Sequence, residues 1–380
     1  MTLFLLTFFL LYGSLHLYAF LRARAAFAFS TPTGVFLAVF MLLMIVSPII
    51  IRLTEKAGFE LFALVMSFIG YTWMGIIFLF AAFSLLLDLY RNLVSAGGGI
   101  LGRDISFLAV SQRYAFLIPL GISICIAVYG YFEAVSIRTE NIVIQSHKIP
   151  AAIKKVRIAQ ISDVHLGLIV RENRLRRILA EVRKAAPDIL VSTGDLVDGQ
   201  INNLTALASM LQEINPPYGK YAVTGNHEFY AGLDQSSEFI ERAGFNLLRG
   251  ERVDISDFFV IAGVDDPQAK SFGLRRGLSE KALLSDLPDD RFVLLLKHRP
   301  IIDDDSPGLF DLQLSGHVHR GQIFPFSIIT GLYYATQSGL ARLSDGSSLY
   351  VSRGAGTWGP PIRFLSPPEV TVIDILHKDK

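Results

Sequence analysis

Apolar residues are spread unevenly along this chain, and the division falls near residue 135. Four long apolar runs precede that point, at residues 3–20, 34–51, 62–87 and 114–132. Each is long enough for an α-helix that crosses a hydrocarbon core, which takes about 20 apolar residues. The pattern therefore predicts four transmembrane helices. None of the four runs carries a carboxylate or a basic residue in its middle, so nothing here favours a channel or a pump.

The first run lacks a basic segment ahead of it and a processing site after it, which favours a membrane helix over a cleaved signal peptide. It contains His16. An ionisable residue inside a membrane can mark a transport path, but a lone neutral histidine is more often a packed side chain, and we expect the latter.

Lysine and arginine in the short loops predict the orientation of the helices. One side of the membrane collects Arg22, Arg24, Arg91, Arg103 and Arg113, and the other collects Arg52, Lys56, Arg138 and Lys148. The difference is one charge. It favours both termini, and the domain after the helices, on the non-cytoplasmic side.

After residue 135 the pattern changes to alternating short elements. We expect a four-helix transmembrane domain at 1–135, a polar linker at 136–155 and an α/β domain at 156–380. Strands are predicted at 156–162, 188–193, 220–224, 258–263, 292–296, 312–315, 333–336, 348–352 and 370–376, and helices at 172–186, 204–214, 235–243 and 278–285. Alternation followed by runs of strands predicts a two-sheet β-sandwich flanked by helices.

Composition agrees with a membrane protein. The chain is 51% hydrophobic and 18% charged, with a mean hydropathy of +0.44. Its net charge of +1 gives no basic field, so no nucleic-acid partner is expected. The single cysteine, Cys125, excludes a disulfide framework within the chain and a cysteine-based metal site. Composition does not determine the oligomeric state.

The candidate chemistry begins where the strand at 156–162 ends, in Asp163-Val164-His165. In an extended segment, residues i and i+2 point to the same side, so this carboxylate and imidazole can meet on one metal ion. Taken alone the triplet is a weak signal, because a polar loop after a buried strand has the same appearance.

Further strands end in the same way. The following blocks are Gly194-Asp195-Leu196-Val197-Asp198, Gly225-Asn226-His227-Glu228, Lys297-His298-Arg299 and Gly316-His317-Val318-His319. Together with His165, five of the eight histidines of the chain fall in these strand-end turns. Glycine before Asp195, Asn226 and His317 suits a sharp turn with close backbone approach.

Carboxylate, amide and imidazole ligands suit Mn²⁺, Fe, Zn²⁺ or Mg²⁺ better than a thiolate-preferring metal. The candidate ligands are Asp163, His165, Asp195, Asn226, His298, His317 and His319. They exceed what one tetrahedral ion uses. We therefore expect two divalent metal ions that share a bridging carboxylate at a separation of about 3.5–4 Å, a pair able to hold a phosphoryl group and to supply hydroxide at neutral pH.

In this order, the five blocks resemble the signature of the calcineurin-like metallophosphoesterases. The resemblance covers roughly residues 150–376, and not the membrane helices. The stretches 349–361 and 367–370 are similar to a membrane-associated bacterial branch that contains UDP-2,3-diacylglucosamine pyrophosphatase-like members. The expected function is hydrolysis of a phosphodiester, phosphomonoester or pyrophosphate bond.

The resemblance implies a role for each residue. Asp163, His165 and His319 would hold one metal, Asn226, His298 and His317 the other, and Asp195 would bridge them. His227 matches the catalytic histidine, which protonates the leaving group or stabilises the charged transition state, and Asp198 matches the carboxylate that orients it. An imidazole beside the metals can act as a general acid near neutral pH.

The chain departs from the branch at Arg320, where glycine is expected. Its guanidinium would reach a substrate phosphate or lie in solvent, and we favour solvent. Further candidates for gripping an anionic substrate, each more often structural, are Arg275, Arg276, Arg353, Trp358 and Arg363. For the run Asp303-Asp304-Asp305 a solvated loop is the better account.

The membrane anchor favours a lipid-linked or membrane-proximal substrate, with membrane lipids as neighbours. The alternative is a membrane receptor or scaffold that uses the fold for binding without turnover. Loss of ligands would favour that alternative, and all seven are present.

Overall fold

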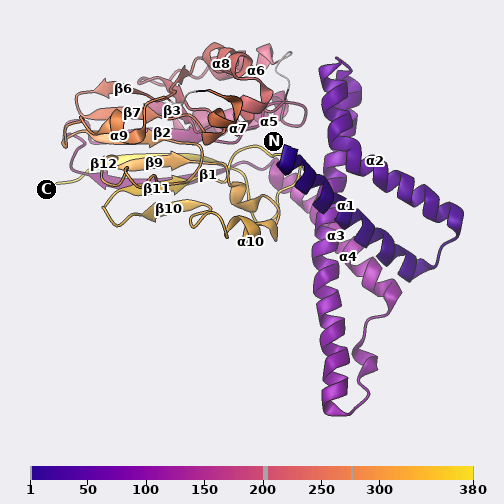
Figure 1. Ribbon diagram of the computed structural model, residues 1–380. Coiled ribbons are helices and arrows are strands. Elements are labelled where there is room, and N and C mark those ends of the chain that lie inside the picture. The colour runs from indigo at the N-terminus through magenta and orange to yellow at the C-terminus, as the bar shows by residue number, and fades with distance from the viewer. Residues whose placement is uncertain (1, 200–203, 275–276, 380) are drawn as a thin grey trace. The chain divides into compact units, whose positions relative to one another are not determined.

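The computed structural model describes residues 2–199, 204–274 and 277–379 (Figure 1). It divides into two compact units. Residues 1–131 with 359–362 are called here the membrane unit, and residues 132–358 with 363–380 are called the catalytic domain, after the function that the sequence predicts for them. Each is described by itself.

The four predicted apolar helices are confirmed. They are α1 (Thr2–Phe27), α2 (Thr31–Lys56), α3 (Glu60–Leu101) and α4 (Gln112–Ala134), with a short η1 (Ser106–Leu108) before α4. All four are long and apolar enough to cross a membrane. Each extends beyond its apolar run, and the 42 residues of α3 span about 63 Å, about twice a hydrocarbon core. Gly102, in the left-handed conformation, ends α3.

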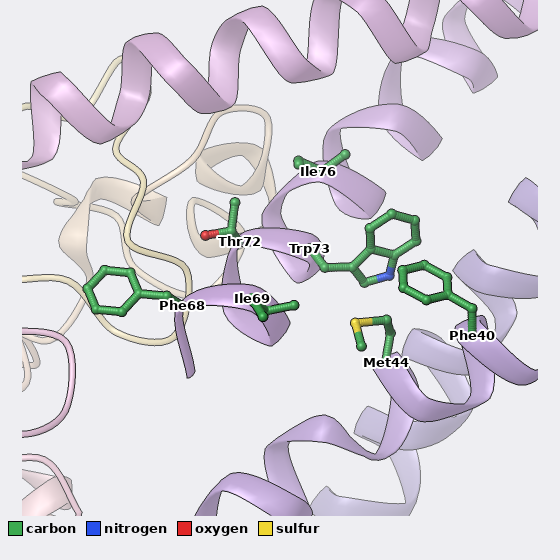
Figure 2. Close-up of a pocket in the computed structure, with 7 residues that line it drawn as sticks. All are labelled: Phe40, Met44, Phe68, Ile69, Thr72, Trp73 and Ile76. Atoms are coloured by element: carbon green, nitrogen blue, oxygen red, sulfur yellow. The ribbon is translucent and has the colours of Figure 1, made fainter. Parts of the chain in front are cut away.

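Packing in the membrane unit is apolar around a few paired polar groups. Helices α2 and α3 approach closely at Gly70, where a Cβ would lie 2.5 Å from Ser47 Oγ. Figure 2 shows a groove along these two helices in which the rings of Phe40 and Trp73 lie together, with Thr72 as its polar side chain. None of the seven residues that line the groove carries a carboxylate, an imidazole or a basic group.

The catalytic domain contains two six-stranded sheets, as expected of a two-sheet sandwich. Its strands are β1 (Arg138–Ser146), β2 (Lys155–Ile161), β3 (Ile189–Ser192), β4 (Lys220–Ala222), β5 (Asn246–Leu247), β6 (Glu251–Ser256), β7 (Phe259–Gly263), β8 (Phe292–Leu296), β9 (Leu312–Ser315), β10 (Gly339–Arg342), β11 (Ser348–Val351) and β12 (Glu369–His377). The orders are β1-β12-β2-β3-β4-β5 and β10-β11-β9-β8-β7-β6.

Helices flank the sheets. They are α5 (Glu172–Ala185), α6 (Thr205–Gln212), α7 (Asn226–Ala231), α8 (Leu233–Arg242), α9 (Glu280–Leu284) and α10 (Phe326–Thr330), with short turns η2 (Pro267–Phe272) and η3 (His319–Gly321). Alternate residues of each strand face opposite ways. Ile158 of β2 packs in the core between the sheets, and Ala159 packs in the core with α5, α6 and α8. On the second sheet, Val293 packs with residues of α9.

Among the described residues, the structure contains five helices and strands that were not predicted, β5, β6, β10, α7 and α10, and two further segments differ from the prediction. The stretch expected as a linker, 136–155, contains β1, which pairs in parallel with β12 from Arg138 opposite Glu369 to Ser146 opposite His377. The strand predicted at 333–336 is wrong, because these residues form a turn and irregular chain after α10. Leu332 and Tyr333 are each 80% exposed, so the apolar pattern there does not reflect core packing.

The strands β2, β3 and β4 run parallel in the first sheet, and β8 and β9 run parallel in the second. Their carboxyl ends carry all five predicted ligand blocks. This edge of the sandwich positions the site.

Candidate metal centre

Three overlapping groups of acidic and histidine side chains could hold metal ions among the described residues. They are Asp163 with His165 and His319, Asp195 with His298 and His317, and His165 with Asp195 and His227. The ligand atoms in each group lie within 4.8 Å of one another. The structure thus brings together six of the seven predicted ligands, from both sheets, at one edge.

The first group is almost completely buried. His319 Nε2 lies 3.3 Å from Asp163 Oδ1, and 3.1 Å from His165 Nε2. Two neutral imidazoles with facing nitrogens can share one proton, but a cation accepts both lone pairs at once. Burial and the neighbouring His227 lower the pKa of His165 to about 3. It is therefore held in the neutral form that binds metal.

The second group repeats this arrangement. His298 Nε2 lies 3.2 Å from Asp195 Oδ2 and 3.1 Å from His317 Nδ1. The remaining predicted ligand, Asn226, begins α7, and its buried Oδ1 has no hydrogen-bond partner in the part of the chain that the structure describes. Buried polar atoms are nearly always paired, so this oxygen fits a metal ligand.

Asp195 lies near histidines of both the first and the second group. Besides His298, its Oδ2 lies 3.9 Å from His165 Nε2. Burial lowers the pKa of His298, but Asp195 and its hydrogen bond raise it to about 10. A proton on His298 thus balances the buried carboxylate when nothing else does. A cation would balance the same charge, and the donor set fits two ions that share Asp195.

His227 lies beside these groups and contacts Asp198. Its Nδ1 is 2.8 Å from Asp198 Oδ1, and its backbone N–H donates to Asp195 Oδ1 at 2.8 Å. Burial lowers the pKa of His227, but Asp195 and Asp198 outweigh it and raise the pKa to about 9. The imidazole is therefore cationic at neutral pH, with Nδ1 engaged by Asp198.

The backbone at these strand ends is tight. Gly225 and Gly316 lie so close to the carboxylates of Asp195 and Asp163 that a Cβ at either glycine would overlap them. Five non-glycine residues at the site adopt positive φ, between 49° and 70°: Asp163, His165, Asp195, His317 and His319. This conformation is costly for residues with a Cβ.

Glu228 has a role that the sequence did not reveal. It is fully buried, and its carboxylate accepts four backbone hydrogen bonds, from Asp195 N (3.0 Å), Leu196 N (2.8 Å), Val197 N (3.2 Å) and Gly225 N (2.6 Å). Burial and Asp195 raise its pKa to about 7, while these donors act in the opposite direction. Glu228 therefore ties the turn after β3 to the turn after β4. Its place in Gly225-Asn226-His227-Glu228 was the available signal.

Arg363, expected as a substrate contact or a structural residue, is structural. Its side chain is fully buried. Its Nη2 donates to His319 Nδ1 at 3.0 Å and to Gly356 O at 2.7 Å, and its Nη1 donates to Arg353 O at 2.7 Å. Arg363 therefore braces a predicted ligand from the side away from the other ligands.

The other arginines considered as substrate contacts, and the acidic run at 303–305, do not belong to the ligand groups. Arg353 pairs with buried Glu369 at 2.6 Å, Arg320 is exposed, and Arg275 and Arg276 lie outside the described residues. Asp303 accepts from Lys297 at 2.9 Å, and Asp304 and Asp305 are exposed, as expected of a solvated loop.

Aromatic rings pack against two of the histidines. The ring centroids of Trp358 and Tyr230 lie 6.1 Å and 5.5 Å from that of His227. The ring centroid of Tyr334 lies 5.7 Å from that of His317.

Comparisons with known proteins agree with this geometry. The family model described as calcineurin-like phosphoesterase matches residues 156–321. An uncharacterized metallophosphoesterase of Aquifex aeolicus is 43% identical over 68% of this chain and 98% of its own length. An uncharacterized metallophosphoesterase of Campylobacter jejuni is 35% identical over 61% of this chain. A transmembrane protein with metallophosphoesterase domain from Danio rerio is 31% identical over 68% of this chain.

The chain spans 62% of the length of the Campylobacter relative and 62% of the zebrafish relative. With four apolar helices, it is a membrane protein. On the relatives and on the order and convergence of its blocks, the chain belongs to the calcineurin-like metallophosphoesterase family of phosphoester hydrolases.

Proposed function

We propose that the catalytic domain hydrolyses a phosphodiester, phosphomonoester or pyrophosphate bond at a dinuclear metal centre. The observation that carries this proposal is the position of Asp195, which belongs both to a group with His298 and His317 and to a group with His165. A carboxylate shared in this way suits two ions that hold one phosphoryl group between them.

In this proposal, Asp163, His165 and His319 hold one ion, Asn226, His298 and His317 hold the other, and Asp195 bridges them. The ions are Mn, Fe, Zn or Mg, as the oxygen and imidazole donors allow. When bound, such a pair polarises phosphoryl oxygens and lowers the pKa of water.

His227 acts on the leaving group of the substrate. Asp198 engages Nδ1 at 2.8 Å, which leaves Nε2 to face the substrate with its proton. A cationic imidazole there stabilises negative charge on the departing oxygen and donates a proton to it. Asp198 fixes the ring orientation, and its negative charge favours the protonated ring.

The membrane helices support a lipid-linked or membrane-proximal substrate. The similarity of residues 349–361 and 367–370 to UDP-2,3-diacylglucosamine pyrophosphatase-like enzymes supports a pyrophosphate bond in an amphiphile as one form of it. The distribution of basic loop residues supports a catalytic domain on the non-cytoplasmic side. A receptor or scaffold without turnover is the weaker candidate, since all seven predicted ligand residues are present.

The test compares turnover of bis(p-nitrophenyl) phosphate and p-nitrophenyl phosphate by the purified full chain with Mn²⁺. We expect turnover of at least one ester, and a loss of about 10²- to 10⁴-fold in His227→Ala with unchanged metal content. The proposal fails if the metal-loaded wild type and His227→Ala are equally inactive on every phosphate compound offered.

A further inference from the structure

An exposed apolar segment follows the predicted metal ligand His319 and ends at Tyr334, which packs against another predicted ligand, His317. It comprises residues 324–334, with α10 in its middle. The exposed fractions are 39% for Phe324, 62% for Ile328, 46% for Ile329, 80% for Leu332 and 80% for Tyr333. Scattered exposed apolar residues are ordinary, but so many within eleven positions mark an interaction surface. We call it the apolar flap.

The charge pattern around the apolar flap is also distinctive. No charged residue occurs from 321 to 341, and the stretch is bounded by Arg320 and Arg342, which are both exposed. Aliphatic side chains with a tyrosine among them and arginine at the margins match a lipid interface, where apolar groups enter the acyl region and guanidinium groups meet phosphate.

The apolar flap is fixed to the metal centre at both ends. At its start, Gly321 directly after His319 and Arg320 lies so close to α10 that a Cβ would overlap Ser327 N. At its end, the Tyr334 ring packs edge-on against His317, with centroids 5.7 Å apart. Whatever surface the flap contacts is therefore next to the ligands.

The chain itself keeps the catalytic domain near a bilayer. Helix α4 ends at Ala134 and β1 begins at Arg138. The three residues between them reach about 14 Å from one element to the next even when fully extended. A lipid surface is therefore within reach of a domain tethered this closely.

We propose that the apolar flap is a membrane-docking surface. Ile328, Ile329, Leu332 and Tyr333 enter the interface of the lipid bilayer, and Arg320 and Arg342 lie at the level of the phosphate headgroups. The partner is the bilayer, because an uncharged aliphatic segment between arginines is complementary to lipid. The metal centre then opens at the membrane surface. The docking does not require turnover; its implication, that the substrate is a membrane amphiphile, rests on the proposed function.

The test measures depth with the full chain in nanodiscs of phosphatidylcholine and phosphatidylglycerol. In a Cys125→Ser background, a spin label is attached at Leu332→Cys. The control is Asp257→Cys, in the exposed turn before β7, at the end of the sheet opposite the ligands. We expect the label at 332 to be more accessible to oxygen than to a water-soluble nickel complex, and the label at 257 to show the reverse.

Two outcomes would overturn the docking proposal. One is equal nickel accessibility at both positions. The other is protection at 332 from both reagents with spin–spin broadening, which would identify a second copy of the chain as the occupant.

A second arm measures the ratio of turnover on a vesicle-borne phosphate ester to turnover on bis(p-nitrophenyl) phosphate. Leu332→Ser with Tyr333→Ser should lower this ratio roughly tenfold, because two apolar side chains no longer enter lipid. Val143→Ser removes another exposed apolar side chain, 58% exposed on β1, and should leave the ratio unchanged. A ratio unchanged in the double variant would remove the link between docking and substrate. If the 332 label enters lipid while no ester is hydrolysed, docking stands and the proposed function fails.

Discussion

Histidines in the two units differ in how their nitrogens are satisfied. In the membrane unit, His16 is 2% exposed, its Nδ1 lies 2.8 Å from Tyr12 O, and its Nε2 accepts from Trp73 Nε1 at 2.8 Å. One nitrogen donates and one accepts, which is all that a neutral imidazole can do. In the catalytic domain, His165 and His319 instead present Nε2 atoms to each other at 3.1 Å.

This difference separates a structural histidine from a metal ligand more reliably than burial does. His16 and His165 are equally buried, at 2%. His16 needs nothing beyond the protein, whereas the buried Nδ1 of His165 has no partner among the described residues and its Nε2 faces a like atom. The expectation that His16 is a packed residue agrees with its geometry.

The largest effect should follow from removing the shared carboxylate. Asp195→Asn should lower the content of both metal ions and reduce turnover by about three orders of magnitude, because such ions contribute several kcal/mol to the transition state. Metal analysis and turnover on p-nitrophenyl esters measure this, with Asp257→Asn as an exposed control. Two bound ions per chain and wild-type turnover in Asp195→Asn would show that Asp195 is not the bridge.

The second prediction tests the two histidine types directly. His165→Gln should reduce metal content and lower turnover by at least about 100-fold, more than the loss of an outer partner does. His16→Leu should leave both unchanged and lower the thermal midpoint, since the half-buried Trp73 N–H then loses its acceptor, a cost of about 1 kcal/mol. Equal loss of metal in the two variants would abolish the distinction drawn between them.

A smaller effect is expected at Glu228. In Glu228→Gln one carboxylate oxygen becomes an NH2 group that faces backbone donors, so the turns after β3 and β4 separate. Metal affinity should weaken about 10- to 100-fold, measured by competition with a chelator. Glu238→Gln, on the exposed face of α8, provides the control. Unchanged affinity at both positions would mean that the four hydrogen bonds do not hold the site.

The smallest effect concerns Lys220, a buried polar group with its partners in place. Its Nζ donates to Leu211 O at 2.9 Å and Ala243 O at 2.7 Å, and burial lowers its pKa to about 8. The ordinary pKa is about 10.4. Because the folded pKa is the lower one, the contribution of Lys220 to stability is present above about pH 10.4 and is lost as the pH falls to about 8.

The thermal midpoint of the wild type should therefore rise relative to that of Lys220→Met between pH 8 and pH 10. Below pH 8 the difference between the two midpoints should stay constant. Metal content should be the same in both proteins. A constant difference across the whole range would show that the lysine pKa is not lowered in the folded protein.

Local spacing in the sequence was sufficient to predict the four membrane helices, most strands, and all described helices of the catalytic domain except α7, α10 and the short turns. The same spacing gave the candidate ligands, because each block sits at the end of its own strand. Their individual metal roles stay predictions. By contrast, β1 was interpreted as a linker, since its partner β12 lies more than 220 residues away and the pairing is not encoded locally. The apolar residues at 333–336 suggested a strand because sequence alone does not distinguish an exposed apolar residue from a core one.

The supporting roles of Glu228 and Arg363 could not be predicted from the sequence for the same reason. Glu228 acts on backbone groups about 30 residues away, and Arg363 acts on His319, which is 44 residues away. Both depend on which turns meet in space. A charged side chain that will be fully buried has the same sequence signal as one on the surface.

The positive φ angles at five predicted ligands have a consequence for how the protein fails. Each left-handed residue costs roughly 1–2 kcal/mol, so the site stores several kcal/mol that the two sheets and the bound ions must hold in place. The weakest part of the domain is then the part that performs the chemistry. On gentle heating or metal removal these turns should relax while the sandwich persists, so activity disappears from a protein that still looks folded.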